Sequence, residues 1–216
     1  MNYILVIKLS NFSYSTNQDF YVFGFYMIIR KIRNTDVESI SKLHIKVFDK
    51  SYFSVYYTLS DLSKYFNKLL EFNEYSYVCE DNNTIFGYLI GGFRTQEAVN
   101  IFLKENRIKI LYYIFRNPKF IVIAINKLFK KTVSQKLKSK VGLRLFLIGV
   151  DPSVSKKGVG AQLVKKFEED ILLGGYNEYG LYVRTDNQKA ISFYLNRGFV
   201  KEFKNFDLFS FTKLIN

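Results

Sequence analysis

Hydrophobic residues recur along the chain with two different periods, and these periods predict an alternation of strands and helices. Apolar stretches of strand length occur at residues 28–32, 75–80, 84–93, 143–150, 180–184, 199–204 and 206–214. Apolar residues at helical spacing occur at residues 37–47, 60–70, 100–115, 161–173 and 187–196. This order predicts an α/β (α+β) fold, a mixed central sheet flanked by helices.

Polar residues and glycines mark the ends of these elements. Asn34-Thr35-Asp36 and Ser60-Asp61 are typical helix-start signals, and Gly174-Gly175 ends a helix. Asp81-Asn82-Asn83 lies between two strand patterns and predicts a hairpin turn. Asn117-Pro118 breaks the pattern of residues 100–115, and a second apolar run follows at residues 120–129. We therefore expect a helical insertion at about 94–140, between the third and fourth core strands.

The positive charge is concentrated in this insertion. The chain has a net charge of +13. The segment from Arg94 to Arg144 contains 13 Lys or Arg residues and only 2 Glu residues. Three interpretations remain open for the insertion: two packed helices with a solvated basic face, a lid over an acceptor site, or a surface that docks on an anionic membrane. Nucleic-acid binding is not favoured, because no known binding module or basic-aromatic strand pattern is present.

The length of 216 residues fits one domain, either a monomer or a homodimer. Residues 1–26 show no clear period, and Met27 begins a strand-like run. Two interpretations stay open: an upstream extension before a domain at 27–216, or an additional edge strand at Tyr3–Leu9. A single cysteine, Cys79, excludes an intrachain disulfide, and charged residues interrupt the most apolar stretch, residues 108–129. We expect a cytoplasmic location and no membrane span.

Residues 150–161 contain the clearest chemical signal. They read Val-Asp-Pro-Ser-Val-Ser-Lys-Lys-Gly-Val-Gly-Ala and join a predicted strand to a predicted helix. A helix start presents unpaired backbone N–H groups at the positive end of the helix dipole. Gly158 and Gly160 carry no Cβ, so an anion can approach the backbone closely. The segment therefore predicts a site for a phosphate or pyrophosphate.

A second sequence segment, taken together with residues 150–161, indicates a resemblance to a known protein family. The first block resembles the acetyl-CoA motif of GCN5-related N-acetyltransferases (the GNAT superfamily), which usually reads Arg/Gln-x-x-Gly-x-Gly/Ala after a strand. The block from Val183 to Phe199 is similar to the family's Asn…Ala…Phe-Tyr…Gly-Phe signature, with Asn187, Ala190 and Tyr194 in place. The resemblance covers about residues 28–214 apart from the insertion, and it implies a GNAT fold.

The resemblance assigns roles to particular residues. The loop from Gly158 through Val159 and Gly160 to Ala161 would donate N–H groups to the pyrophosphate of acetyl-CoA, and the backbone of Val150 would align the acetyl group. Asn187 would contact the cofactor arm, although helix capping alone also explains it. Tyr194 would act as the general acid for the leaving thiolate, and a half-buried helix aromatic is the alternative.

One position departs from the family pattern. The usual Arg or Gln falls on Ser155, and we hypothesise that Lys156 or Lys157 supplies the missing positive charge. A general base is harder to find: Glu80, Asp81 and His44 are weak candidates, and water can serve instead.

The resemblance implies an N-acetyltransferase that moves an acetyl group from acetyl-CoA to a primary amine by direct attack and needs no metal. The acceptor stays open among an amino sugar, a small amine and a protein amine, and an anionic acceptor could meet the basic insertion. The alternative function is a non-catalytic module that binds CoA, an anionic partner or a membrane.

Overall fold

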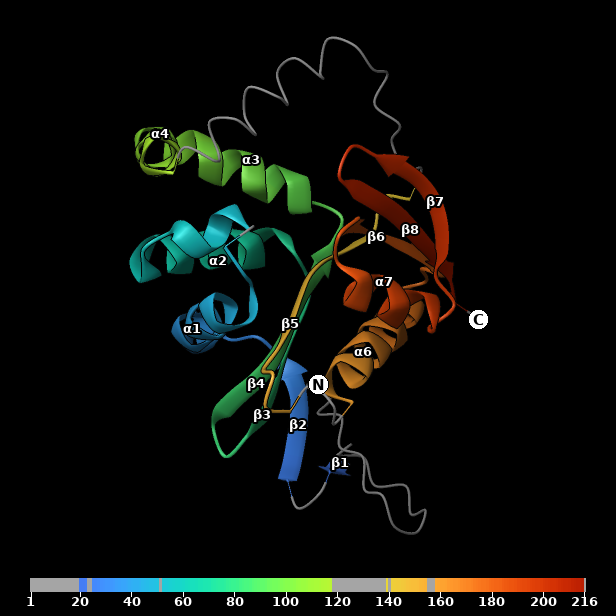
Figure 1. Cartoon of the computed structure of the whole chain (residues 1–216). Coiled ribbons are helices and arrows are strands. Elements are labelled where there is room, and N and C mark those ends of the chain that lie inside the picture. The colour runs from blue at the N-terminus through green and yellow to red at the C-terminus, as the bar shows by residue number, and fades with distance from the viewer. Residues whose placement is uncertain are drawn as a thin grey trace.

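A single mixed sheet forms the centre of the protein (Figure 1). The computed structural model describes residues 20–22, 25–50, 52–117, 139, 141–154 and 158–215, and it describes side chains from Met27 onward. The strand order is β1-β2-β3-β4-β5-β6-β8-β7. The strands are β1 (Phe20–Val22), β2 (Phe25–Lys31), β3 (Tyr75–Asp81), β4 (Thr84–Gly92), β5 (Arg144–Val150), β6 (Glu178–Arg184), β7 (Val200–Asn205) and β8 (Leu208–Leu214). The pair β5–β6 is parallel, and the other described neighbours are antiparallel.

Helices cover both faces of the sheet (Figure 1). One face carries α1 (Val37–Val47), α2 (Leu59–Phe72), α3 (Thr95–Glu105) and α4 (Arg107–Arg116), and the other carries α6 (Val159–Leu173) and α7 (Gln188–Leu195). Each layer buries its own core against the sheet. The fully buried Phe66 and Tyr88 belong to the first core, and the fully buried Phe167 and Phe211 belong to the second. No helix among the described residues is both long and apolar enough to cross a bilayer.

The predicted element order and fold class are confirmed, while several boundaries differ. The second helix begins at Leu59 rather than at Ser60-Asp61, because Thr58 is its N-cap and its Oγ1 accepts a hydrogen bond from the Asp61 amide at 3.2 Å. β2 begins at Phe25, two residues before Met27, and pairs with β1. The alternative edge strand at Tyr3–Leu9 lies outside the described residues.

The insertion also differs in detail from the prediction of one helix over residues 100–115. Helical structure begins at Thr95, and it divides into α3 and α4 at Asn106. The Phe102 carbonyl accepts hydrogen bonds from the Asn106 amide at 3.0 Å and from the Asn106 side chain at 2.9 Å. Asn106 itself has φ −112° and ψ 22°, outside the helical range, so α4 starts in a new direction. The predicted second apolar run at 120–129 lies outside the described residues.

Candidate active site

The sheet splits between its two central parallel strands. β5 and β6 pair at Arg144 and Gly180, where the Gly180 amide donates to the Leu143 carbonyl at 3.0 Å. Beyond this point β5 continues to pair with β4 as far as Val150, and β6 continues to pair with β8 as far as Arg184. Each strand therefore follows its outer neighbour, and the two carboxyl ends diverge. A change of direction at the carboxyl ends of parallel strands is a common place for a ligand in α/β folds.

Helix α6 starts beside the end of β5 with a left-handed glycine. Gly158 is the N-cap residue and has φ 77° and ψ 6°, a conformation that side chains other than glycine rarely adopt. The first intrahelical hydrogen bond runs from the Gln162 amide to the Gly158 carbonyl at 3.0 Å. The amides of Val159, Gly160 and Ala161 precede that bond, so they stand at the positive end of the helix. The side chain of Val159 is fully buried, so only its backbone is available to a ligand.

Three elements meet at Gly160. A Cβ placed on Gly160 would lie 3.5 Å from the ring of Phe193 on α7 and 3.6 Å from the Val150 side chain at the end of β5. A Cβ on Gly158 would meet no atom within 4 Å among the described residues other than its chain neighbours. The predicted residues Val150, Gly158 and Gly160 are therefore neighbours at the split.

Helix α7 places the predicted tyrosine on the same side. Asn187 is the N-cap residue, and its Oδ1 accepts a hydrogen bond from the Ala190 amide at 3.1 Å. The capping role of Asn187 is thus observed. Tyr194 is 5% exposed and packs edge-on against Phe193 and Phe199, with ring centroids 5.2 and 5.1 Å away. Burial raises the pKa of Tyr194 well above its usual value, and the nearby Tyr52 adds to this effect, so the phenol is protonated at neutral pH.

Tyr52 is a site residue that the sequence did not single out. It lies in the loop between α1 and α2, close to the Asn187 side chain: burial raises the pKa of the Tyr52 hydroxyl, and Asn187 partly offsets this rise. The Arg184 guanidinium carbon at the end of β6 lies 5.5 Å from the centre of the Tyr52 ring. The loop therefore crosses from the α1 layer to α7 over the diverging strands. Its only sequence signal is an unusual density of tyrosine and phenylalanine between two amphipathic helices.

The three candidate bases occupy very different places. His44 is 1% exposed, with Nδ1 2.6 Å from the Tyr88 hydroxyl and Nε2 2.7 Å from Ser54 Oγ. Burial lowers the pKa of His44 to about 4, so its ring is neutral at pH 7. Asp81 ends β3 at the hairpin turn, in register with Thr84. His44 therefore matches the interpretation as a core histidine whose hydrogen bonds are satisfied.

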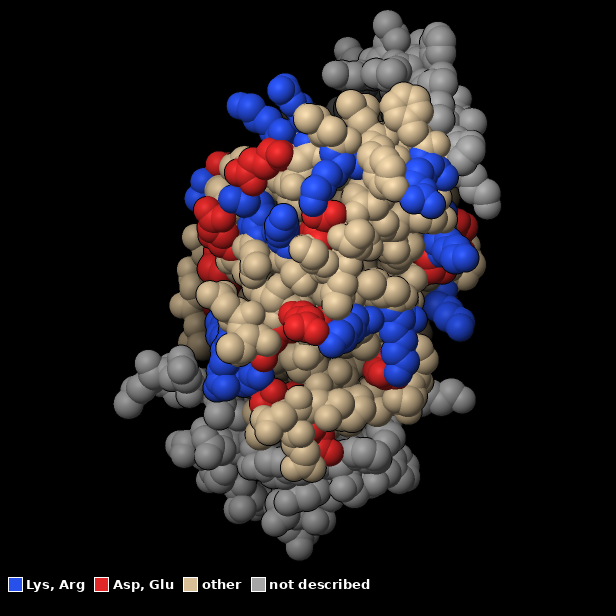
Figure 2. Space-filling model, turned by 90° about the vertical axis from the view of Figure 1, so that its left-hand side faces the viewer, with Lys and Arg blue, Asp and Glu red and all other residues tan. Residues whose placement is uncertain are grey.

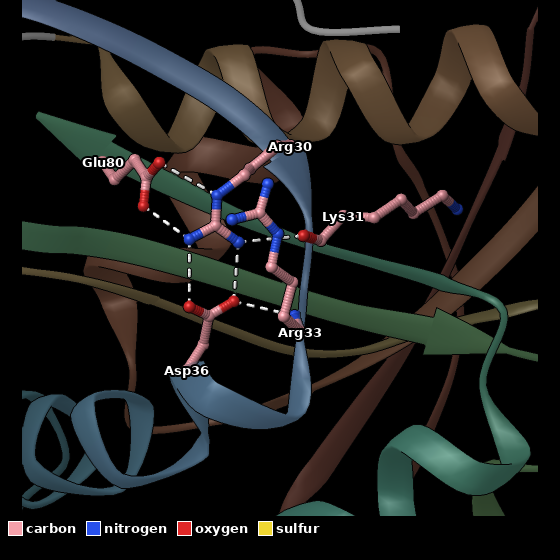
Figure 3. Close-up of polar contacts among 5 residues, drawn as sticks. All are labelled: Arg30, Lys31, Arg33, Asp36 and Glu80. Atoms are coloured by element: carbon pink, nitrogen blue, oxygen red, sulfur yellow. Dashed lines mark hydrogen bonds and ion pairs between the residues drawn. The ribbon is translucent and has the colours of Figure 1, made fainter. Parts of the chain in front are cut away.

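Glu80 is engaged in a charged network on β2 and β3, which β4 separates from the β5–β6 split. The guanidinium of Arg30 lies between two carboxylates and donates two hydrogen bonds to Glu80 and two to Asp36 (Figure 3). The amide of Arg33 adds a hydrogen bond to Asp36 at 2.7 Å. Burial alone would raise the pKa of Asp36, but these hydrogen bonds lower it below its usual value. The network ties β2, β3 and the start of α1 together, so Glu80 is bound to a fixed cation.

The hypothesis for Lys156 and Lys157 stays a prediction. Both residues and Ser155 lie outside the described residues, so the structure does not place them. Among the residues that the structure describes, no group of three or more His, Cys, Asp or Glu side chains could hold a metal ion.

Comparisons with known proteins agree with this geometry. A family model described as "Acetyltransferase (GNAT) family" matches residues 38–199. The fold is similar to that of the PaiA N-acetyltransferase from Thermoplasma acidophilum in complex with coenzyme A, at 15% identity and a TM-score of 0.57, covering 87% of this chain and 98% of that one.

Two further solved structures share the fold. The ribosomal-protein-S18-alanine N-acetyltransferase from Escherichia coli has 15% identity and a TM-score of 0.54, covering 88% of this chain and 94% of that one. Naa20 from Chaetomium thermophilum, in complex with a bisubstrate analogue, has 18% identity and a TM-score of 0.50, covering 87% and 86%. The comparison with curated proteins found no match.

Proposed function

The chain belongs to the GNAT family of acetyltransferases, and we propose that it transfers an acetyl group from acetyl-CoA to a primary amine by direct attack. The observation that carries this proposal is the meeting of three features at the β5–β6 split. These are the left-handed start of α6 at Gly158, the end of β5 at Val150, and the buried phenol of Tyr194 on α7.

The residues at the split fit the co-substrate. The amides of Val159, Gly160 and Ala161 would donate hydrogen bonds to the pyrophosphate, and no described residue beyond the chain neighbours of Gly158 would meet a Cβ placed there. The backbone of Val150 would align the acetyl group, and Asn187 would hold the pantetheine arm. Lys156 and Lys157 would add positive charge near the phosphates. Acetyl-CoA supplies a thioester, whose carbonyl carbon is open to attack by a neutral amine.

Tyr194 has a defined part in the transfer. The amine nitrogen bonds to the carbonyl carbon, the carbon–sulfur bond breaks, and the thiolate leaves with the bonding pair. A thiol ordinarily has a pKa of about 8.5, and burial raises the pKa of the Tyr194 phenol further above that of the thiol. The Tyr194 O–H therefore stabilises the developing thiolate chiefly as a hydrogen-bond donor, and solvent completes its protonation. The proton lost by the amine passes to water, since Glu80 and His44 are both engaged.

The loop between α1 and α2 would form the acceptor side. Tyr52 borders Asn187 and Tyr194, so an amine reaching the thioester passes this loop. The structural neighbours include enzymes named for different amine acceptors, among them a ribosomal-protein alanine. An amino sugar, a small amine and a protein amine therefore all belong in the test.

The experiment is a thiol-release assay with acetyl-CoA and an amine panel. The panel contains a polyamine, an amino sugar, and matched peptides with free or blocked N-termini. We expect release of coenzyme A that depends on one class of amine, together with an acetylated product by mass spectrometry. Firm CoA binding by calorimetry without turnover on any amine would reject the enzyme and favour a non-catalytic CoA-binding module.

A further inference from the structure

Helix α4 is fixed to the domain by one of its faces. On that face the Tyr113 hydroxyl donates a hydrogen bond to Asp61 Oδ2 at 2.8 Å and accepts one from the Thr58 amide at 3.0 Å. Lys109 Nζ lies 2.6 Å from Asp61 Oδ1. Tyr113 is buried and packs against Tyr57, with ring centroids 5.3 Å apart. These contacts orient α4, so the direction of its opposite face is determined.

The opposite face is apolar and exposed. Ile108 is 77% exposed and Phe115 is 71% exposed, and Leu111 and Tyr112 between them are each more than half exposed. Leu111, Tyr112 and Phe115 lie three, four and seven residues after Ile108, so the four side chains form one stripe along the helix. Isolated exposed apolar residues are common on soluble proteins, whereas four large ones on a single ten-residue helix form a contiguous patch.

Basic residues surround this stripe. Helix α4 begins with Arg107 and ends with Arg116 and carries no acidic residue, while its Lys109 pairs with Asp61 on the fixed face. Lys104 is exposed in the last turn of α3, and the neighbouring Glu105 pairs with Lys68. Figure 2 views the side of the molecule that carries α1, α2 and α4; the uncharged surface at its upper end has Lys and Arg side chains on either side, with Asp and Glu side chains beside those at the left. A second copy of the same helix would bring like charges together, so a dimer through this face is disfavoured. An apolar stripe flanked by cations is the pattern of a helix that lies in the interface of an anionic bilayer.

We propose that the exposed face of α4 docks on an anionic lipid surface. Ile108, Leu111 and Phe115 insert among the acyl chains, and Arg107 and Arg116 contact the lipid phosphates. Tyr112 lies at the boundary, and its hydroxyl accepts a hydrogen bond from Arg116 at 2.6 Å. Because the buried face of α4 holds Thr58 at the end of the α1–α2 loop, the docked orientation presents the candidate acceptor side close to the membrane.

The test uses the full chain and vesicles of equal parts phosphatidylglycerol and phosphatidylcholine. The chain has no tryptophan, so the variant F115W gives an emission signal from one position. We expect F115W to shift to shorter wavelength on the anionic vesicles, to be quenched by brominated acyl chains, and to lose the shift on pure phosphatidylcholine or at high salt. The matched control is L173W, since Leu173 is 85% exposed at the far end of α6 and should give no shift.

Variants then assign the binding to the stripe. In the F115W background, I108N/L111N should weaken vesicle partitioning by about tenfold or more, because two inserted apolar side chains are lost. L173N in the same background should leave partitioning unchanged. Both variants alter exposed positions, and unchanged circular dichroism and thermal midpoint verify folding.

Several outcomes would overturn the proposal. These are the absence of an F115W shift on anionic vesicles, and equal partitioning of I108N/L111N and L173N, which would place the binding elsewhere in the basic insertion. A shift that appears without vesicles and rises with protein concentration, together with a dimer in sedimentation, would assign the stripe to a second copy of the chain. Acetyl-transfer activity is not the readout, so the proposed function can fail or hold independently.

Discussion

The single histidine makes the pH dependence of stability a sharp test of the structure. Burial between Tyr88 and Ser54 lowers the pKa of His44 to about 4, while an unfolded histidine has a pKa of 6.5. Between these values the unfolded chain binds a proton that the folded chain does not bind. Lowering the pH therefore favours unfolding throughout this window, and stability is regained as the pH rises above 6.5.

The size of the effect follows from the two pKa values. A gap of about 2.5 pKa units corresponds to about 3 kcal/mol when the pH falls below both values. Between pH 7 and pH 5 the expected loss in the free energy of unfolding is about 2 kcal/mol. Asp36, Asp61 and Asp151 have pKa values lowered from 3.8, so they are ionised in both states above pH 5 and contribute little in this window.

The assay is urea unfolding at pH 7, 6 and 5 for the unmodified chain and for H44N. We expect the unmodified chain to lose about 2 kcal/mol and H44N to show almost no dependence in this range, from a lower starting stability. Proton NMR of the one imidazole gives a second measurement that does not depend on the variant. A His44 signal that titrates near pH 6.5 in the folded protein would refute the buried, doubly hydrogen-bonded assignment.

Three further predictions concern the site and the packing. Y194F should lower kcat by about 100-fold with little change in the KM for acetyl-CoA, measured by thiol release; an unchanged kcat would remove Tyr194 from the reaction. G91A should destabilise by about 1–3 kcal/mol in urea unfolding, because its Cβ would lie 2.6 Å from the ring of a fully buried phenylalanine on α6. G142A is its control, with its nearest contact at 3.6 Å. D36N should lower the free energy of unfolding by about 2–3 kcal/mol in the same assay, because Arg30 would then pair with Glu80 alone. A loss below about 0.5 kcal/mol, the size expected for a surface substitution, would contradict the buried network.

Much of the fold could be predicted because its information is local. An amphipathic period needs only the residues of one element, so the core strands and the α1 and α6 patterns were found with small boundary errors. The start of α6 could be predicted for the same reason, because Gly158 and Gly160 directly before a helical pattern indicate a helix start that an anion can approach. Asn187 also carried a local signal, because an asparagine before a helical pattern is a favoured N-cap.

The features that were missed depend on residues far apart in the chain. Arg30 and Glu80 are fifty positions apart, and neither differs in sequence from an exposed charge on a strand. Only the pairing of β2 with β3 brings them together, and it removes Glu80 from the candidate bases. Tyr52 is one aromatic among many, and its meeting with Asn187 depends on the path of a whole loop. The break at Asn106 is a change of backbone angles at one residue, which the periodic pattern of residues 100–115 does not show.

The loop that contains Tyr52 is held at two points by contacts that sequence patterns do not show. His44 binds Ser54 near its middle, and Tyr113 on α4 binds the Thr58 amide at its end. The first contact is made by an imidazole that is neutral at pH 7, because burial lowers the pKa of His44 to about 4. The second contact is made by α4, which belongs to the insertion. The candidate acceptor side therefore depends on a buried histidine on α1 and on a helix of the insertion. Because one face of α4 fixes this loop while the other face is exposed and apolar, the insertion links the site to whatever surface that face contacts.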